Sequence, residues 1–350
     1  MEKDSFQKLN RQIAEYCDAN QITGVLRVTQ KDQILFQWTF GYADRENRTP
    51  FTENSMFTLY SMSKPFCAMG LLKLKDLGLV ELDTHPSKYV PETAAFHPHV
   101  TLRHLLQHTS GIPDFEQTGD FRQKYAPGSA DKIREHLKLL SSYPSHFLPG
   151  SAGMYANVNY VLAALIIENV TSLTYAEYMR REVFEPLGMK HTVADKEGLY
   201  IPDRVTGYEP VNGRLAPVEK SLDWMLGAGD LVATVKDVYT LNLAIKHGLL
   251  LTPETWAEAL IPTPLNQKAM AGCTVSLWHG KHRITHNGGH TGFRTLHICL
   301  PQEDFDIIFL SNSGYGDARA EISEIIYSEF YHSNGAIKKS DSIEMDKGYI

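Results

Sequence analysis

The sequence predicts an α+β fold of three layers (α/β/α), with an antiparallel sheet assembled from both ends of the chain. Strand-like runs occur near the N-terminus and again near the C-terminus, whereas the middle shows mainly helical patterns separated by proline and glycine. The repeated strand–helix–strand order of a doubly wound parallel sheet does not occur. We therefore expect one domain over residues 1–335, in which a mainly helical part (79–265) is inserted into a sheet part (1–78 and 266–335), followed by a polar tail (336–350).

The N-terminal part of the chain predicts two helices and a pair of strands. Ser5–Asn20 has one apolar face, as an amphipathic helix requires. Gly24–Thr29 and Gln33–Phe40 read as two strands joined by a polar turn. Pro65–Leu77 is apolar over much of its surface, so we expect this helix to be buried between other elements.

The remaining elements follow from the same periodicities. Helical patterns cover Leu102–His108, Lys132–Leu140, Tyr160–Asn169, Tyr175–Phe184 and Val235–His247. Strand patterns return at Cys273–Trp278, Ile284–His286, Thr295–Leu300 and Phe305–Ser311. A last helix is predicted over Ala318–Tyr331.

Composition narrows the class of protein. Of the 350 residues, 43% are hydrophobic and 21% are charged, which suits a globular protein with a substantial core. The net charge of −7 argues against a nucleic-acid partner. No run reaches the ~18 apolar residues of a membrane span, and the N-terminal residues lack the basic-then-apolar layout of a secretory leader. We therefore expect a cytoplasmic protein without a membrane partner.

Several common signatures are missing from the sequence. The four cysteines form no C-x-x-C pair, so neither a disulfide framework nor a zinc ribbon is indicated. The motifs of usual α/β-hydrolases, P-loop NTPases, dinucleotide-binding enzymes and zinc proteases do not occur either. We expect no cofactor.

The first chemical signal is Ser61 with Lys64 at the start of an apolar helix. Residues three apart there share a face, and the helix N-terminus supplies positive potential and free N–H groups beside the hydroxyl. An unprotonated amine in that position helps to remove the proton of the serine. The same spacing occurs at Ser5/Lys8 and at Ser129/Lys132. Only Ser61 opens an apolar helix, although a plain helix cap would explain it equally well on its own.

Two further motifs carry groups that suit the same chemistry. Tyr155-Ala156-Asn157 is the only Tyr-x-Asn of the sequence and follows a glycine-containing loop. A phenol there can relay a proton between nucleophile and leaving group, and the amide can hold a substrate carbonyl; a buried structural tyrosine is the alternative. His286-Asn287-Gly288-Gly289 lies on a predicted strand, where adjacent glycines indicate a bulge or a close approach to the backbone, such as substrate pairing along the strand edge.

Together these motifs resemble the serine β-lactamase and penicillin-binding-protein-like hydrolases, nearest to the branch of class C β-lactamases, D-alanyl-D-alanine carboxypeptidases and the carboxylesterases of the same fold. The resemblance runs from about Gly24 to Asn312. Its ordered blocks are Phe57–Lys64, Leu102–Pro113, Tyr155–Asn157, Glu185–Met189, Gly227–Leu231 and His286–Gly288 with Gly292-Phe293. The resemblance implies a β-lactamase/transpeptidase-like fold.

The resemblance also implies roles for individual residues. Ser61 resembles the nucleophile, with Lys64 as the base or cation beside it and Tyr155 as the general acid/base. Asn157 resembles the residue that holds the substrate amide. The N–H groups of Ser61 and Gly289 would form the oxyanion hole.

The chain departs from the family pattern where Lys-Thr-Gly reads His286-Asn287-Gly288. Such a histidine resembles certain D-peptidases and esterases, and Asn287 stands where a threonine hydroxyl often binds a carboxylate. We therefore expect a serine hydrolase of small esters or amides that forms an acyl-enzyme on Ser61. A true β-lactamase or D-Ala-D-Ala carboxypeptidase is the alternative. A non-catalytic ligand sensor or scaffold is the alternative of another class.

A metal site competes for the histidines near the C-terminus. The histidines concerned are His279, His282, His286, His290 and His297. Neutral imidazole is a common zinc ligand, but no cysteine or carboxylate pair completes a set. We expect no metal.

Overall fold

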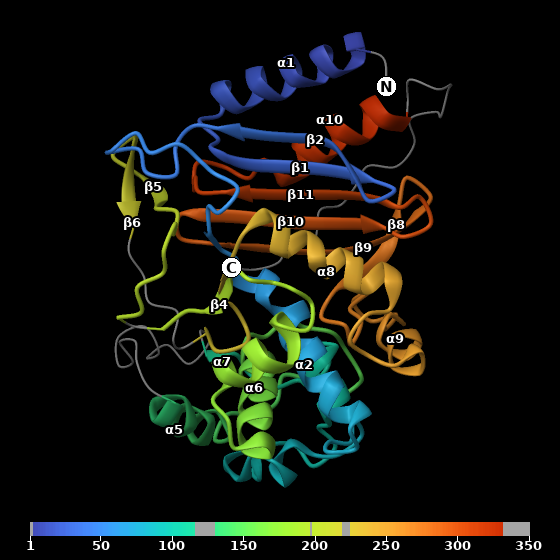
Figure 1. The fold of residues 1–350 in the computed structure, drawn as a ribbon. Coiled ribbons are helices and arrows are strands. Elements are labelled where there is room, and N and C mark those ends of the chain that lie inside the picture. Colours follow the sequence, from blue (N-terminus) through green and yellow to red (C-terminus); the bar gives the residue numbers. More distant parts are fainter. Residues whose placement is uncertain (1–2, 116–129, 197, 219–224, 332–350) are drawn as a thin grey trace.

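A six-stranded sheet forms the centre of the protein. The computed structural model describes residues 3–115, 130–196, 198–218 and 225–331. The strands run β2-β1-β11-β10-β9-β8, and each is antiparallel to its neighbours. Their bounds are β1 (Gly24–Gln30), β2 (Gln33–Phe40), β8 (Thr274–Trp278), β9 (Lys281–His290), β10 (Phe293–Leu300) and β11 (Phe305–Ser311). The prediction that both chain ends build one antiparallel sheet is confirmed (Figure 1).

The burial of each strand reflects its place in the sheet. β11 is buried at every residue and β1 at all but the last, because both lie inside the sheet with helices on both faces. β2 forms an edge, and buried and exposed residues alternate along much of it. Continuous apolar runs therefore mark the inner strands, while an alternating run marks an edge.

One outer layer consists of the two terminal helices, α1 (Lys3–Ala19) and α10 (Arg319–Tyr331). Leu9 and Ile13 of α1 and Ile322 of α10 are fully buried in one apolar cluster with side chains of the sheet. Figure 1 shows both helices at the top of the molecule, beside β2 and β1. This face of the sheet is thereby closed by residues from the two ends of the described chain.

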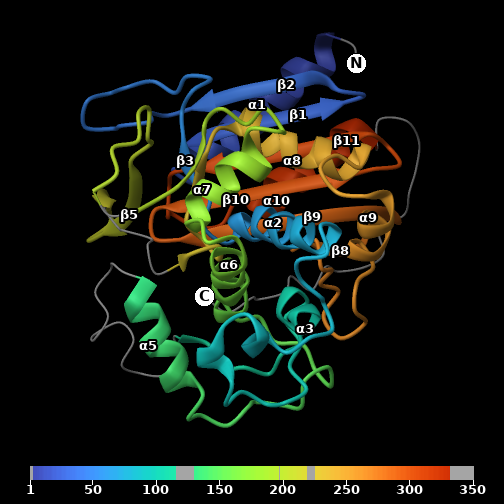
Figure 2. The ribbon, with the colours of Figure 1, turned by 60° about the horizontal axis from the view of Figure 1, so that its bottom comes forward.

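On the opposite face α8 (Val235–His247) packs against β11, β10 and β1, and the helical part beside it contains α2 (Lys64–Asp76) and α6 (Val158–Thr171). The prediction of a buried helix here is confirmed, because α2 buries Phe66, Leu71 and Leu72 completely. α2 packs against α6, and the turn that precedes α2 contacts β9 (Figure 2). This packing brings the start of α2 beside the sheet.

Shorter elements complete the middle of the chain. The helices are α3 (Leu102–Leu106), α5 (Ala130–Leu140), α7 (Tyr175–Met179) and α9 (Pro253–Ala259), with a π-helical turn η5 (Arg180–Phe184) and 3-10 turns η1 (Tyr60–Ser63), η2 (Pro86–Lys88) and η3 (Pro91–Thr93). The strands are β3 (Phe57–Thr58), β7 (Leu231–Ala233) and β4 (Thr192–Ala194) in one small sheet, and β5 (Gly207–Val211) with β6 (Arg214–Val218) in a hairpin. The sequence patterns indicated none of these small strands.

Two predictions about the whole chain keep their status as predictions. The domain boundaries are untested, and the tail 336–350 lies outside the described residues. Within the described ranges, every helix is too short or too polar to cross a membrane. The cytoplasmic location is likewise a prediction.

Candidate active site

Ser61 lies on a tight turn between a strand and a helix. The chain leaves β3, passes through η1 and enters α2 at Lys64. Tyr60, directly before Ser61, adopts φ +49°, a left-handed conformation that is rare for a bulky residue. Its hydroxyl donates to the carbonyl oxygen of Thr291 at 2.8 Å, which ties the turn to the end of β9. This backbone leaves Ser61 half-buried while Lys64 is fully buried.

Three predicted side chains from two distant motifs meet at this turn. Lys64 Nζ lies 3.1 Å from Ser61 Oγ, and the Tyr155 hydroxyl donates to Ser61 Oγ at 2.6 Å. Lys64 Nζ also lies 4.7 Å from the centroid of the Tyr155 ring. A hydroxyl, an amine and a phenol are thus in direct contact.

The amine of Lys64 has three polar neighbours. It donates to Asn157 Oδ1 at 2.9 Å and to the carbonyl oxygen of Ala228 at 2.6 Å, and Ser61 Oγ is the third. Burial lowers the pKa of Lys64 to about 7, and the positive charge of Lys268 acts in the same direction, against the raising effect of Asp114. A substantial share of Lys64 is therefore uncharged at neutral pH.

A buried carboxylate fixes the loop that carries Tyr155 and Asn157. Asp114 Oδ2 accepts from the backbone N–H of Asn157 at 2.7 Å, and Oδ1 accepts from that of Val158 at 3.0 Å. The first N–H groups of a helix have no acceptor within the helix. Asp114 accepts from two of them and so acts as a cap for α6, although it is distant in sequence. Asp114 directly follows one of the quoted motif blocks, and this adjacency is the signal that the sequence offered for it.

His108 supports the ring of Tyr155. The two rings stack with centroids 4.4 Å apart and an interplanar angle of 28°. His108 is buried, and its Nδ1 accepts from the backbone N–H of Ala156 at 3.2 Å. Burial lowers the pKa of His108 well below its usual value, so the ring is neutral. The motif block that contains His108 was recognised, but its place beneath Tyr155 was not.

The contact between Lys64 and Ala228 depends on a second buried carboxyl. Asp230 Oδ1 accepts from the backbone N–H of Gly227 at 3.0 Å and so closes the turn that presents the Ala228 carbonyl. Burial raises the pKa of Asp230 to about 8. The turn is therefore held by a carboxyl that is largely protonated at neutral pH.

The His286–Gly289 stretch lies on β9, which is longer than predicted. The predicted strand ended at His286, whereas β9 continues to His290 in unbroken register with β10. β8 pairs with β9 only as far as Thr285, so the following residues extend beyond the end of β8. The glycines were predicted to mark either a bulge or a close approach to the backbone. The unbroken register with β10 shows no bulge. The close approach holds, because a Cβ atom at Gly288 would lie 1.9 Å from the carbonyl oxygen of Leu59.

His286 is the buried side chain of this stretch. Its Nδ1 donates to the carbonyl oxygen of Asn287 at 2.6 Å, which leaves Nε2 without a proton in the neutral ring. Burial, together with the charges of Lys268 and Lys64, lowers the pKa of His286 well below its usual value. Asn287 and Gly289 are exposed. The position that carries a lysine in the family pattern therefore carries a neutral group here.

Two of the histidines considered for a metal site have separate partners. His279 Nε2 contacts Glu324 Oε2 at 2.8 Å, and His297 Nδ1 contacts Asn242 Oδ1 at 2.8 Å. Within the described parts of the chain, no three His, Cys, Asp or Glu side chains are grouped as a metal site would need.

Most of the sequence fits one family. The family model described as Beta-lactamase matches residues 9–327. The chain belongs to the beta-lactamase family. The resemblance inferred from the motifs is thereby confirmed, and so is the fold that it implied.

Relatives of this beta-lactamase-family chain include penicillin-binding proteins and hydrolases. Penicillin-binding protein 4* of Bacillus subtilis (strain 168) is 28% identical over 325 residues, which cover 84% of this chain and 69% of the relative. A D-aminopeptidase of Gluconobacter oxydans (strain 621H) is 24% identical over 294 residues, which cover 83% of this chain and 55% of the relative. Both relatives are longer than the part that matches.

Solved structures share the fold. The D-amino acid amidase of Ochrobactrum anthropi SV3, complexed with D-phenylalanine, has a TM-score of 0.80 at 24% identity, covering 93% of this chain and 100% of the amidase. The penicillin-binding protein of Bacillus halodurans has a TM-score of 0.78 at 23% identity, covering 89% and 98%. At these identities the likeness shows the fold alone.

Proposed function

We propose that this protein is a serine hydrolase that forms an acyl-enzyme on Ser61 and hydrolyses small esters or amides. The observation that carries the proposal is the environment of Lys64, whose amine faces two carbonyl acceptors and one hydroxyl. A neutral amine has two N–H groups and one lone pair. Asn157 Oδ1 and the Ala228 carbonyl only accept, so they take the two N–H groups. The lone pair is left for the proton of Ser61 at 3.1 Å.

The acyl-transfer steps follow from this arrangement. Ser61 Oγ attacks the substrate carbonyl carbon as its proton passes to Lys64. The bond to the leaving group then breaks, and the leaving oxygen or nitrogen receives a proton through the Tyr155 hydroxyl, which lies 2.6 Å from Ser61 Oγ. Water then attacks the acyl carbon and gives up a proton to the Tyr155–Lys64 pair. The acyl–oxygen bond breaks, the acid is released and Ser61 Oγ takes the proton back.

The strand β9 provides the second wall of this proposed site. We assign the oxyanion hole to the backbone N–H groups of Ser61 and Gly289, and substrate contacts to Asn157, His286, Asn287 and Gly288. The close packing of Gly288 on Leu59 supports this assignment because it places β9 directly beside the segment that leads to Ser61. Donors fixed in this way stabilise the developing oxyanion without reorganising.

The neutral His286 stands where the family pattern has a lysine, and this departure supports small esters or amides as substrates. A substrate carboxylate would need another cation of the site. Purified protein would be assayed with p-nitrophenyl esters of graded chain length, with nitrocefin and with D-Ala-D-Ala peptides. We expect the highest kcat/KM for short esters. Rapid nitrocefin hydrolysis with slow ester turnover would instead identify a β-lactamase.

Covalent labelling tests the acyl-enzyme itself. A fluorophosphonate should add one mass increment, and peptide mapping should find it on Ser61. Ser61→Ala should lose both label and turnover. Ser5→Ala is the matched control, because Ser5 has the same spacing to a lysine, and it should label fully. A folded protein that takes no label would support the sensor or scaffold alternative.

A further inference from the structure

A compact segment between α9 and β8 carries a lysine to the edge of the candidate site. Thr263 N–H donates to the Lys268 carbonyl and Gln267 N–H donates to the Thr263 carbonyl, each at 2.9 Å. Ala269 N–H donates to the Cys273 carbonyl, also at 2.9 Å. The backbone on both sides of Lys268 is thus fixed by its own hydrogen bonds.

This segment packs directly on the start of α2. Gly272 has φ +77°, and a Cβ atom there would lie 2.8 Å from Pro65 Cα and 2.9 Å from the Lys64 carbonyl oxygen. Asn266 Nδ2 donates to the Gln107 carbonyl at 3.0 Å, beside the residue that stacks on Tyr155. The segment therefore keeps a set position relative to both Lys64 and Tyr155.

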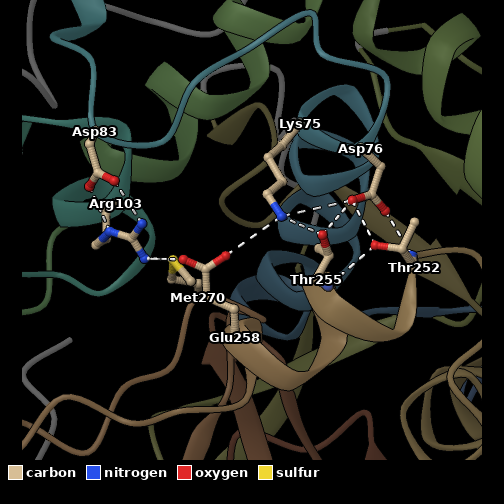
Figure 3. A network of polar contacts seen from close by, with 8 residues as sticks. All are labelled: Lys75, Asp76, Asp83, Arg103, Thr252, Thr255, Glu258 and Met270. Atoms are coloured by element: carbon tan, nitrogen blue, oxygen red, sulfur yellow. Dashed lines mark hydrogen bonds and ion pairs between the residues drawn. The ribbon is translucent and has the colours of Figure 1, made fainter.

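A polar network holds the segment from the other side (Figure 3). Arg103 Nη1 contacts Met270 Sδ at 3.2 Å and donates to Glu258 of α9 at 2.8 Å. Lys75 of α2 reaches the same Glu258 at 3.6 Å. α2, α3 and α9 are thereby linked around the segment that carries Lys268.

The amine of Lys268 lies among the groups of the site. Its Nζ donates to Thr274 Oγ1 at 2.8 Å and lies 5.9 Å from the centroid of the Tyr155 ring. Thr274 pairs with Thr285, so the amine lies beside the point where β9 extends past β8. Lys268 is half-buried, which leaves part of it accessible to a ligand.

Lys268 supplies a positive charge beside two groups, His286 and Lys64, whose neutral forms are favoured. His286 is neutral, and Lys64 must lose its proton to act as a base. Lys268 favours both neutral forms through like-charge repulsion, after the larger effect of burial. The positive charge of Lys268 then lies on the Tyr155 side of the site, where the proposed mechanism places the leaving group.

We propose that Lys268 is a specificity-determining residue that binds a carboxylate on the leaving group of the substrate. This inference rests on the proposed function, because it concerns the leaving group of the Ser61 reaction. A charge-assisted contact of this kind raises kcat/KM for an anionic substrate by about 10- to 100-fold over its neutral analogue.

A matched pair of thioesters tests the proposal. The first is a benzoylglycyl thioester of thioglycolate, whose leaving group carries a carboxylate; the second is its methyl ester, which is neutral. Thiol release gives kcat/KM for each. In the unaltered protein the anionic compound should be favoured, and Lys268→Met should reduce the anionic-to-neutral ratio about tenfold or more. Added salt should reduce the ratio in the unaltered protein only.

Two further variants separate charge from local structure. Lys268→Arg keeps the charge and should retain most of the preference. Thr274→Val removes the hydrogen bond to the amine but keeps the charge, so the preference should largely remain. Equal losses on both thioesters in Lys268→Met, or no preference in the unaltered protein, would overturn the proposal.

Ser61→Ala distinguishes this inference from the proposed function. Thiol release that persists in Ser61→Ala would refute the proposed function. Because that variant can still bind substrate, calorimetry on it and on Ser61→Ala/Lys268→Met gives a readout without turnover. The anionic thioester should bind more tightly when Lys268 is present. Failure of the unaltered protein and of Ser61→Ala to act on or bind this compound would refute the role of Lys268.

Discussion

The ring of Tyr155 stacks on the buried ring of His108 with centroids 4.4 Å apart, while its hydroxyl contacts Ser61 Oγ at 2.6 Å. Tyr155→Phe keeps the stacking and removes only the hydroxyl. We expect kcat to fall about 10²- to 10⁴-fold with little change in Tm, because proton transfer is lost and packing is not. Stopped-flow ester hydrolysis and thermal unfolding measure the two effects.

Tyr160→Phe is the control for this change. The Tyr160 hydroxyl donates to the Leu106 carbonyl at 3.0 Å, away from Ser61. Its loss should cost about 1 kcal/mol of stability and leave most of the activity. Equal activity in Tyr155→Phe and the unaltered protein would remove Tyr155 from the mechanism.

The pH dependence of kcat/KM reports on Lys64. Below pH about 7 its amine is protonated and cannot accept the proton of Ser61. We therefore expect kcat/KM to rise as pH increases through about 7 and then to level off, since this profile follows groups of the free enzyme. Lys64→Arg, which keeps a proton at every accessible pH, should be inactive throughout. A flat profile across this range would contradict Lys64 as the base.

Adjacent glycines of β9 should differ sharply in their tolerance of a side chain. A Cβ atom at Gly288 would collide with the backbone of Leu59, whereas one at Gly289 would meet only the side chains of Arg294 and Arg319, at 3.2 Å or more. Gly288→Ala should therefore cost about 1–3 kcal/mol or more of stability, and Gly289→Ala much less. Urea unfolding of both variants checks this. Similar losses in the two would show that β9 shifts freely against Leu59.

Asp230 should make stability depend on pH. Unfolded, this carboxyl loses its proton near pH ~4, whereas in the folded protein it keeps the proton up to about pH 8. Between these values the folded chain binds more protons, so the contribution of Asp230 to the free energy of unfolding falls as pH rises. Asp230→Asn retains an acceptor for the Gly227 N–H and cannot ionise.

The Tm of Asp230→Asn minus that of the unaltered protein should therefore increase from about pH 5 to about pH 8. The full effect is at most a few kcal/mol. Asp203→Asn, at an exposed position, provides the comparison. A constant difference between Asp230→Asn and the unaltered protein would show that this carboxyl is already ionised at acidic pH.

Local signals in the sequence predict some elements to the residue. α8 was predicted as Val235–His247 and has these bounds, because Thr234 caps its first turn and Gly248 ends it in a left-handed conformation. The strand predicted at Ile284–His286 was too short at both ends. The glycines after His286 have low strand propensity and are held by pairing with β10, and Lys281–Arg283 are held by pairing with β8. The strands β3, β4 and β7 have only two or three residues each, too few to show an alternation of apolar and polar residues. They form because they pair with each other across distant parts of the chain.

The sequence predicted those residues of the candidate site that lie in a recognisable motif with a reactive side chain. Ser61 and Lys64 come from one motif block and Tyr155 from another, and the structure brings the three together; their catalytic roles are still predictions. Lys268 lies in no block, and it reaches the site only because the chain folds back from α9 to β8. Asp114 follows one block and Asp230 lies within another, but both act through backbone N–H groups, so the sequence did not show which groups they hold.

The pairing of β1 with β11 has a consequence for how the protein is made. Ser311 Oγ donates to the carbonyl oxygen of Thr23, a residue 288 positions earlier. During synthesis the hairpin β1–β2 therefore leaves the ribosome long before its central neighbour exists, and its inner edge stays open meanwhile. A chain that terminates before Phe305 would lack β11, and the β10–β9 ladder opposite Ser61 would have no strand linking it to the N-terminal hairpin.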